Sequence, residues 1–185
     1  MLELSLPDVH LRLTADRGVF ASERVDTGTK ELLLNAPHPP ANAPASFTMV
    51  DIGCGYGPIA LTLATRAPDA QVWAVDVNER ARQLCESNAE AADLANVHVA
   101  DPADVPDLRF DRIYSNPPIR IGKSALHELL SLWLDRLTPD GIAYLVVQKH
   151  LGADSLTRWL NEQGWPAQKL SSRKAFRILE VKARQ

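Results

Sequence analysis

A glycine-rich turn stands between an apolar run and a helical segment in VDIGCGYGPIALTLA, residues 50–64. The pattern predicts a strand that turns through Gly53, Gly55 and Gly57 into a helix. Glycine lets the backbone approach a ligand closely, and the first amides of a helix, which have no intrahelical partner, point outward. The turn therefore favours a ligand-binding loop, although a tight strand-to-helix connection would use the same residues.

The spacing of these glycines bears on the kind of ligand. A dinucleotide fingerprint requires GxGxxG, whereas this chain has GxGxG with Pro58 at the position of the third fingerprint glycine. Proline suits the first turn of the helix that follows. The sequence therefore favours a nucleoside ligand other than NAD.

Acidic side chains end the next two apolar runs along the chain. Asp76 follows QVWAV, and Asp101 follows NVHVA. A carboxylate can accept hydrogen bonds from both hydroxyls of a ribose, which suits Asp76, or from an adenine amino group, which suits Asp101. Either aspartate alone is typical of a helix cap or a loop. With the glycine loop, however, they predict a nucleoside site at the carboxyl edge of one sheet.

The stretch YSNPPI, residues 114–119, ends the apolar run FDRIY. Each proline lacks a backbone N–H and fixes φ, so the strand cannot continue through them. The result is a rigid corner with the amide side chain of Asn116 at its tip. A plain strand exit, in which Asn116 caps the turn, would have the same residues.

The elements that position these residues alternate between strand and helix. Short runs rich in β-branched residues are mostly separated by helical segments: FTMVDI, QVWAVDV, NVHVA, FDRIYS and IAYLVVQ. The clearest helix runs from Ser124 to Leu137, carries an apolar stripe and is ended by TPDG. After a second amphipathic segment, AQKLSS and FRILEVK are joined by a short link and predict an antiparallel pair. This order predicts an α/β fold with parallel strands and helices on both faces.

The first 45 residues differ from the rest of the chain. Apolar residues alternate on either side of Pro7-Asp8 through residues 2–13, which predicts two short strands. Asp26-Thr27 offers cap oxygens for a helix from Gly28 to about Ala36, and a proline-rich connector follows. We therefore expect an N-terminal extension over residues 1–45, packed on a core domain over residues 46–185.

Composition narrows the class of protein. A chain of 185 residues that is 45% apolar suits one domain with a single core, and a net charge of −3 gives no overall attraction to nucleic acid or membrane. Cys54 and Cys85 form no CxxC pair, which argues against a zinc site and a disulfide framework. The chain shows neither a signal-peptide pattern nor an apolar run long enough to span a membrane. We expect a cytoplasmic protein without a metal.

The segments DIGCGYG, AVDVNERA, FDRIYSNPPI and the upstream GVFASERVDTGTKELL together resemble a known family. They resemble the small-domain class I S-adenosylmethionine-dependent methyltransferases, the group that contains the bacterial 16S ribosomal RNA guanine-N2 methyltransferases. The resemblance spans roughly residues 18–182. It implies a three-layer, doubly wound sheet of seven mostly parallel strands with an antiparallel last strand. It also implies the cofactor S-adenosylmethionine, released as S-adenosylhomocysteine.

The resemblance further implies a set of cofactor-binding residues on the glycine loop, the strand ends and the upstream DTGT segment: Asp51, Gly53, Gly55, Gly57, Asp76, Asp101 and Thr29. Asp51 and the glycine loop would hold the methionine end of the cofactor, Asp76 its ribose and Asp101 its adenine. The DTGT segment resembles one that packs near the cofactor, although a helix start alone would also account for it.

The NPP corner suits methyl transfer to an amine. Transfer from a sulfonium is an in-line displacement, and the exocyclic amine of a base is a poor nucleophile because its lone pair is delocalised into the ring. If both N–H groups donate to the carbonyls of Asn116 and Pro117, the amine becomes more pyramidal and its lone pair points at the methyl. Asn116 and Pro117 are therefore the expected catalytic residues. Because no strong base is needed, His127 and His150 are assigned no catalytic role.

Substrate contacts are expected around this corner. Many amine-methylating relatives have an aromatic residue directly after NPP, on which the target ring stacks, whereas this chain has Ile119. Phe20 or Tyr56 could supply the stacking face, or both could be core aromatics. The expected substrate-binding residues are Phe20, Pro118, Ile119, Arg120 and Lys123.

The C-terminal residues suggest a macromolecular partner. Residues 166–185 carry six basic side chains and one acid, a net of +5 against −8 for the rest. Such a face suits RNA phosphates, although a solvated edge hairpin has the same composition. The expected substrate is guanine N2 of ribosomal RNA, free or in a ribosomal particle. Adenine N6 in DNA, a glutamine side chain of a protein, and a catalytically silent cofactor-binding module remain alternatives, and the oligomeric state is open.

Overall fold

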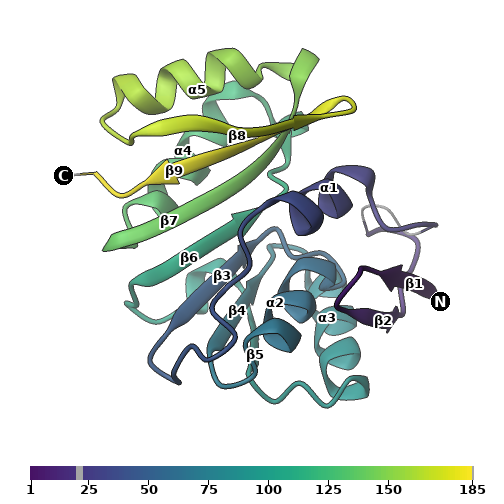
Figure 1. Ribbon diagram of the computed structural model, residues 1–185. Coiled ribbons are helices and arrows are strands. Elements are labelled where there is room, and N and C mark those ends of the chain that lie inside the picture. Colours follow the sequence, from purple (N-terminus) through teal and green to yellow (C-terminus); the bar gives the residue numbers. More distant parts are fainter. Residues whose placement is uncertain (20–22, 185) are drawn as a thin grey trace.

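A mixed sheet of seven strands forms the centre of the computed structural model, which describes residues 1–19 and 23–184 (Figure 1). Its spatial order is β5-β4-β3-β6-β7-β9-β8. The strands are β3 (Thr48–Ile52), β4 (Gln71–Val75), β5 (Val97–Ala100), β6 (Phe110–Ser115), β7 (Leu137–Gln148), β8 (Ala167–Arg173) and β9 (Phe176–Lys182). Strands β3 to β7 pair in parallel, and β9 pairs antiparallel with both β7 and β8. The predicted sheet, its antiparallel last strand and the terminal hairpin are confirmed.

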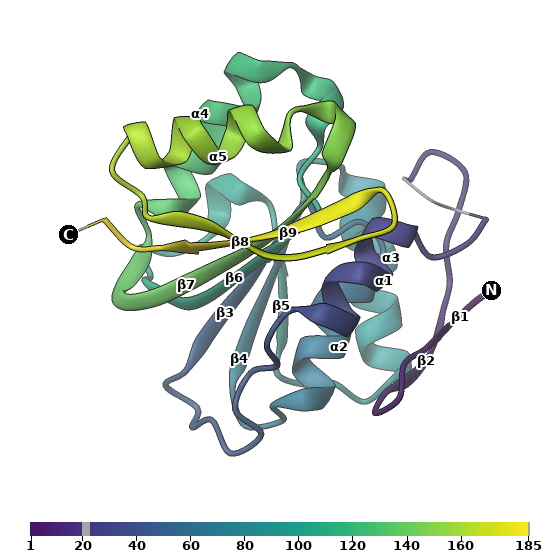
Figure 2. The ribbon, with the colours of Figure 1, turned by 45° about the horizontal axis from the view of Figure 1, so that its top comes forward.

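Helices cover both faces of the sheet (Figures 1 and 2). Helices α1 (Thr27–Asn35), α2 (Pro58–Arg66) and α3 (Glu79–Ala91) lie on one face, and α4 (Lys123–Leu134) and α5 (Ala153–Glu162) lie on the other. Each face has its own apolar core, with Leu61 and Leu63 of α2 in one and Leu130 and Trp133 of α4 in the other. Short 3₁₀ turns follow three strands: η1 (Pro102–Asp104), η2 (Ile119–Ile121) and η3 (Lys149–Leu151).

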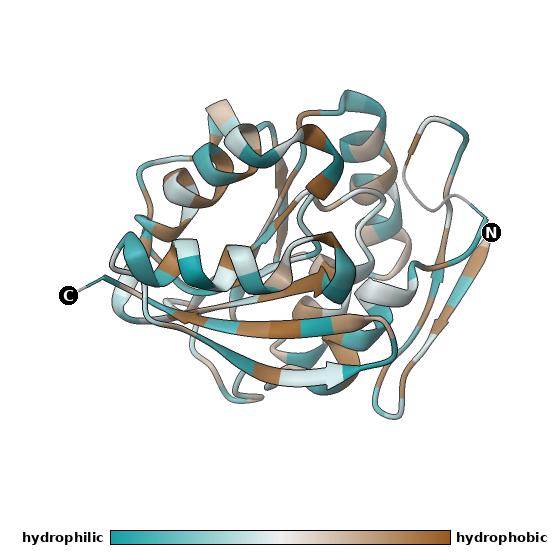
Figure 3. Ribbon diagram, turned by 90° about the horizontal axis from the view of Figure 1, so that it is seen from above, coloured by the Kyte–Doolittle hydropathy of each residue, from teal (hydrophilic) through white to brown (hydrophobic). Residues whose placement is uncertain are grey.

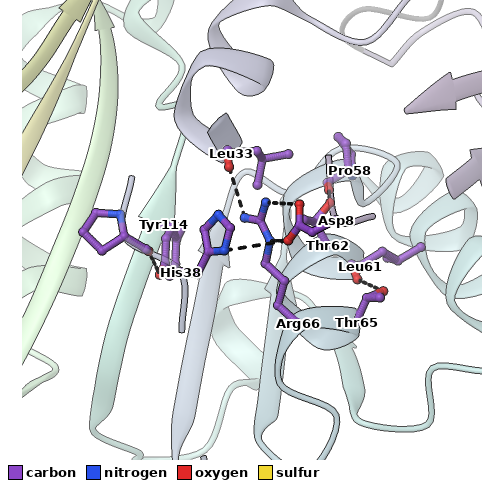
Figure 4. Close-up of polar contacts among 10 residues, drawn as sticks. Asp8, Leu33, His38, Pro58, Leu61, Thr62, Thr65, Arg66 and Tyr114 are labelled. Atoms are coloured by element: carbon purple, nitrogen blue, oxygen red, sulfur yellow. Dashed lines mark hydrogen bonds and ion pairs between the residues drawn. The ribbon is translucent and has the colours of Figure 1, made fainter. Parts of the chain in front are cut away.

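The N-terminal hairpin packs against the α1–α3 face. Strands β1 (Leu2–Ser5) and β2 (His10–Leu13) pair antiparallel, as predicted, and Leu4 and Leu13 join the core cluster that contains α2. Arg66 holds this arrangement, since its Nε and Nη2 donate to the two carboxylate oxygens of Asp8 at 2.8 and 3.0 Å (Figure 4). Its Nη1 also donates to the carbonyl of Leu33 at the end of α1. The division of the chain at residue 45 stays a prediction.

One predicted boundary is wrong. Helix α4 ends at Leu134, whereas the apolar stripe predicted a helix as far as Leu137. Leu137 instead begins β7 and pairs with Phe110, and the TPDG segment lies inside that strand as an irregularity before the pairing resumes at Ile142. Gly141 allows this because a Cβ there would lie 2.8 Å from the carbonyl oxygen of Phe110. The TPDG segment, which predicted a turn, is therefore part of a distorted strand.

Among the residues described, no helix combines the length and apolar character needed to cross a bilayer.

Candidate active site

The predicted functional loops meet where the strand order reverses. From β3 the chain proceeds outward through β4 and β5, then returns to β6 on the other side of β3. The loop after β3 and the loop after β6 therefore leave adjacent strands at the carboxyl edge of the sheet, which is where open α/β sheets bind ligands. The glycine loop and the NPP corner meet at this edge, although they lie far apart in the sequence.

The three glycines of the loop have positive φ but different surroundings. Their φ values are +73° at Gly53, +55° at Gly55 and +98° at Gly57. A Cβ added at Gly53 would meet nothing within 4 Å, and at Gly55 it would meet only a Val19 methyl at 3.9 Å. At Gly57, by contrast, it would lie 2.6 Å from Leu61 and 2.8 Å from the Cys85 sulfur. Gly53 and Gly55 thus face open space, whereas Gly57 is required for packing between α2 and α3.

The amides of the loop are bonded within the protein, contrary to the expectation that they point outward. Gly53 and Cys54 both donate to the carbonyl of Val75, at 2.8 and 2.9 Å. Gly55 donates to Oδ2 of Asp76 at 2.9 Å. These bonds attach the loop to the end of β4, so its shape is fixed before any ligand binds.

Asp76 lies at the centre of these contacts. Its Oδ1 accepts from the amide of Asn78 at 2.9 Å while its Oδ2 accepts from Gly55. A carboxylate has about four acceptor positions, so two remain for donors such as ribose hydroxyls. The side chain is half-buried and keeps access to solvent.

We expect Asp76→Ala to weaken S-adenosylmethionine binding by about 1–3 kcal/mol, because ribose hydroxyls would lose a charged acceptor and Gly55 would lose its anchor. Asp76→Asn should have an intermediate effect, since it keeps an acceptor but not the charge. Isothermal titration calorimetry measures both, with the exposed Asp69→Ala as a matched control. Unchanged affinity in Asp76→Ala would remove Asp76 from the cofactor site.

Asp101 lies after β5, but its carboxylate already has partners. Oδ2 accepts from Nη1 of Arg82 at 3.0 Å, and Oδ1 accepts from the amide of Ala103 at 3.0 Å. The same Nη1 of Arg82 donates to the backbone carbonyl of Asp76 at 2.7 Å. Arg82 therefore links the two acidic strand ends, and an adenine amino group would share Asp101 with it.

Asp51 lies beneath the loop and is fully buried. Its Oδ2 accepts from the amide of Ala60 in the first turn of α2, at 3.0 Å, while Oδ1 is buried with no partner among the described residues. Burial raises the pKa of Asp51 to about 8 from its ordinary value of 3.8. The carboxyl is therefore largely protonated at neutral pH.

This pKa predicts how stability depends on pH. Because the pKa of Asp51 is raised in the folded state, its contribution to the free energy of unfolding is fully present below about pH 4 and is lost as the pH rises through about 8. Asp51→Asn has no proton to lose, so it should keep stability that the original protein loses as the pH rises. Between pH 5 and pH 8, the free energy of unfolding of the variant should rise relative to that of the original protein by about 2–4 kcal/mol. Urea unfolding across this range measures the difference, with Asp69→Asn as the exposed control. Parallel pH profiles for Asp51→Asn and the original protein would contradict the raised pKa.

The amide of Asn116 is oriented by residues from the start of α1. Its Nδ2 donates to Oδ2 of Asp26 at 2.9 Å and to Oγ1 of Thr29 at 3.2 Å. An ionised carboxylate only accepts, so the NH₂ group must face Asp26 and the side-chain carbonyl must point elsewhere. Gly28 makes room for this contact, since a Cβ there would lie 2.9 Å from Oδ2 of Asp26. Thr29, expected to bind the cofactor, here contacts Asn116.

The rest of the NPP corner is folded tightly. The carbonyl of Pro117 accepts from the amide of Ile119 at 2.8 Å, which leaves one of its two lone pairs. Pro118, Arg120 and Lys123 are exposed, and Ile119 is half-buried. The corner therefore has two carbonyl oxygens with a free acceptor position, one on the half-buried Asn116 and one on Pro117, which is a buried residue.

Phe20 and Tyr56 were the two alternative residues for stacking the target base. Phe20 lies outside the described residues. Tyr56 is only 2% exposed, so its ring offers no face to a substrate. Its hydroxyl is buried and has no partner in the part of the chain that the structure describes, and burial together with the nearby Asp26 charge raises its pKa to about 12.

The residues at this edge of the sheet fit S-adenosylmethionine. Gly53 and Gly55 face open space, Asp76 keeps acceptor positions, and two buried oxygens, Oδ1 of Asp51 and Oη of Tyr56, have no partner among the described residues. Asp76 suits the donors of a ligand at the carboxyl edge of β3 and β4, whereas the Asp51 carboxyl and the Tyr56 hydroxyl carry protons at neutral pH and can donate as well as accept.

The model of the methyltransferase small domain family matches residues 10–180. The chain belongs to this family. Membership confirms the predicted enzyme class, an S-adenosylmethionine-dependent methyltransferase.

Known proteins extend this family assignment. The chain is 34% identical to the uncharacterized protein YbxB of Bacillus subtilis over 91% of its own length and 84% of that protein. It is 30% identical to ribosomal RNA small subunit methyltransferase C of Shewanella pealeana over 80% of its length, but only 43% of that relative is covered. The T. thermophilus 16S rRNA N2 G1207 methyltransferase, solved with AdoMet and guanosine, matches with a TM-score of 0.83 at 23% identity, covering 98% of this chain and 50% of that one.

Two residues that bond to the candidate site residues were not predicted in that role from the sequence. Arg82 and Asp26 act through contacts with Asp101 and Asn116, each made between separate elements. Arg82 has a weak sequence signal, since it is a half-buried residue in the first turn of α3, shortly after Asp76 at the end of β4. Asp26 was predicted as a helix cap and as part of the DTGT segment near the cofactor, but not as a partner of Asn116. It is a cap, because its Oδ2 accepts from the amide of Thr29 at 3.0 Å.

Proposed function

We propose that this methyltransferase transfers a methyl group to the exocyclic N2 amine of a guanine in RNA, in the cytoplasm. The observation that carries the proposal is the fixed orientation of Asn116, whose NH₂ group is held by Asp26 and Thr29 at 2.9 and 3.2 Å. A side-chain carbonyl aimed away from these residues is suited to accept a hydrogen bond from an amine, not to donate one.

In this proposal Asp76 and the glycine loop hold the cofactor, with Asp101 and Arg82 at its adenine end. When bound, S-adenosylmethionine supplies a methyl group on a positively charged sulfur. The chain's own residues do the positioning. The carbonyls of Asn116 and Pro117 accept the two N–H groups of the target amine, so the nitrogen lone pair points along the line of transfer. The proton is lost to water once the nitrogen has gained the methyl and become acidic.

The guanine substrate is supported by the names of the relatives. A protein named as a small-subunit ribosomal RNA methyltransferase and a structure described as an N2 guanine methyltransferase with guanosine both resemble this chain. Because the chain spans less than half of the former and half of the latter, RNA contacts of those relatives outside the shared domain do not carry over.

The C-terminal hairpin offers a narrower positive face than its composition predicted. Seen from above, β8 and β9 lie beside α5, and β9 mixes hydrophobic with hydrophilic residues while β8 is mostly polar (Figure 3). Three of the hairpin's cations form ion pairs with acids elsewhere: Lys174 with Glu31, Arg177 with Asp154 and Arg184 with Asp135. Among the described residues, Lys169, Arg173 and Lys182 have no such pair and are exposed, so they are the candidates for phosphate contacts.

The proposal is tested by incubating the protein with radiolabelled S-adenosylmethionine and fractionated RNA, DNA and protein. The labelled product is then digested to nucleosides or amino acids. Label in N2-methylguanosine supports the proposal. Label in N6-methyladenine or methylglutamine would show that the substrate is DNA or protein and not a guanine in RNA. No label in any fraction, with the cofactor bound, would identify a silent binding module.

A further inference from the structure

A cavity of about 160 Å³ lies directly beside the NPP corner. It opens between the first turns of α4 and α5, the 3₁₀ turns η2 and η3, and the end of β7. It is lined by Ile119, Lys123, Leu126, His127, Val147, Leu151, Gly152, Ser155 and Leu156. Because α4 and α5 cover the face of the sheet opposite to α1, this cavity is separate from the contacts that orient Asn116.

The size and walls of the cavity suit one flat ring. Cavities of about 150 Å³ with apolar walls take up a single six-membered aromatic ring. Leu126 and Leu156 are buried and supply the apolar floor, and Ile119 supplies one edge. The His127 ring is held by stacking on Trp159, with 3.7 Å between ring centroids and 12° between planes. The cavity therefore has a preformed wall that needs no reordering when a ligand binds.

The rim of the cavity carries positive charge. Lys123 lines it and is exposed, and Arg120 is exposed on the adjoining turn. Helices α4 and α5 both begin at this rim, after Gly122 and Gly152, and neither has a side-chain cap, so their dipoles add positive potential. Partial burial and Lys123 lower the pKa of His127, so its ring stays neutral at pH 7. An apolar floor below a cationic rim matches a base joined to a phosphate.

The cavity is also continuous with the corner where the target amine is held. Ile119 lines the cavity and follows the NPP residues directly, and its amide donates to the Pro117 carbonyl. An RNA strand with its target base at Asn116 would therefore pass its next nucleotide over this opening.

We propose that this cavity binds the base of the nucleotide adjacent to the target, with Lys123 and Arg120 on the phosphate between the two. The proposal rests on the proposed RNA methyltransferase function. It also gives Ile119 a role other than stacking the target base, because Ile119 would separate the target from its neighbour.

The test combines a change in the protein with a change in the RNA. Ser155 is an exposed first-turn residue on the cavity wall, so Ser155→Phe should fill the cavity without disturbing the core. Its matched control is Ser87→Phe, at an exposed serine of α3 outside the cavity. The RNA is a short oligonucleotide around the mapped methylation site, either intact or with the neighbouring base replaced by an abasic residue on each side in turn.

We expect Ser155→Phe to raise the KM for intact RNA about tenfold, the scale of losing one stacked base, with unchanged cofactor affinity. One of the two abasic substitutions should raise the KM of the original protein to the same degree. On that RNA, Ser155→Phe should raise the KM no further, because the two changes remove the same contact. A Ser155→Phe variant that behaves like Ser87→Phe, or effects that multiply, would overturn the subsite alone. If the original protein labels no RNA, the proposed function fails and the subsite with it.

Discussion

Replacing Asn116 by alanine should reduce methyl transfer by at least about 10²-fold, the scale of losing one positioned polar group in an active site. Binding of S-adenosylmethionine should stay within a few-fold, because Asn116 follows the end of β6 and its described hydrogen bonds go to Asp26 and Thr29. The loss should appear in kcat, since the amine is held in its reactive shape only near the transition state. Single-turnover transfer and calorimetric cofactor binding measure the two quantities separately.

The matched control is Asn42→Ala, at an exposed asparagine of the proline-rich connector. A sharper comparison is Asn116→Asp, which keeps an acceptor oxygen but places a carboxylate where Nδ2 now lies 2.9 Å from Oδ2 of Asp26. Repulsion between like charges would turn or protonate this side chain, so it should be nearly as slow as Asn116→Ala. Full turnover in Asn116→Ala would exclude the amine-acceptor role.

Much of the fold was predictable because its signals are local. The β-branched runs and the glycine turn predicted β3, β4, β5 and β6 to within a residue or two, and the short link after residue 173 predicted the terminal hairpin. The insertion of β9 between β7 and β8 depends on pairing between strands and has no local signal. The end of α4 was missed because Leu137 continues the helical stripe, whereas its pairing with Phe110 determines its state.

The candidate site was predictable where a residue's role follows from its type and its place at the end of a strand. Asp76 and Asn116 follow strands that the sequence identifies, so their common edge could be inferred. The bonding of the loop amides to Val75 and Asp76 could not be inferred, because it depends on the register of β3 against β4. The same holds for Asp26 and Asn116, which are 90 residues apart and meet only when α1 lies over the end of β6.

That contact makes Asp26 a positioning residue, and Asp26→Ser should lower kcat by close to 10²-fold. Serine caps a helix as well as aspartate does, so α1 should keep its first-turn bond to Thr29 and the midpoint of thermal unfolding should hardly move. The shorter side chain cannot reach Nδ2 of Asn116, which would then be free to rotate its carbonyl away from the amine. Cofactor affinity and thermal stability should therefore stay near their original values while turnover falls.

Two further variants separate positioning from a general structural effect. Asp26→Asn restores an oxygen at the same reach and should recover part of the lost kcat, limited by the weaker neutral hydrogen bond. In an Asn116→Ala background, Asp26→Ser should cost almost nothing more, because the group that it positions is already gone. If the two losses multiply instead, Asp26 acts on the reaction by another route. If both are absent, the bond from Asn116 to Asp26 has no part in holding the amine acceptor.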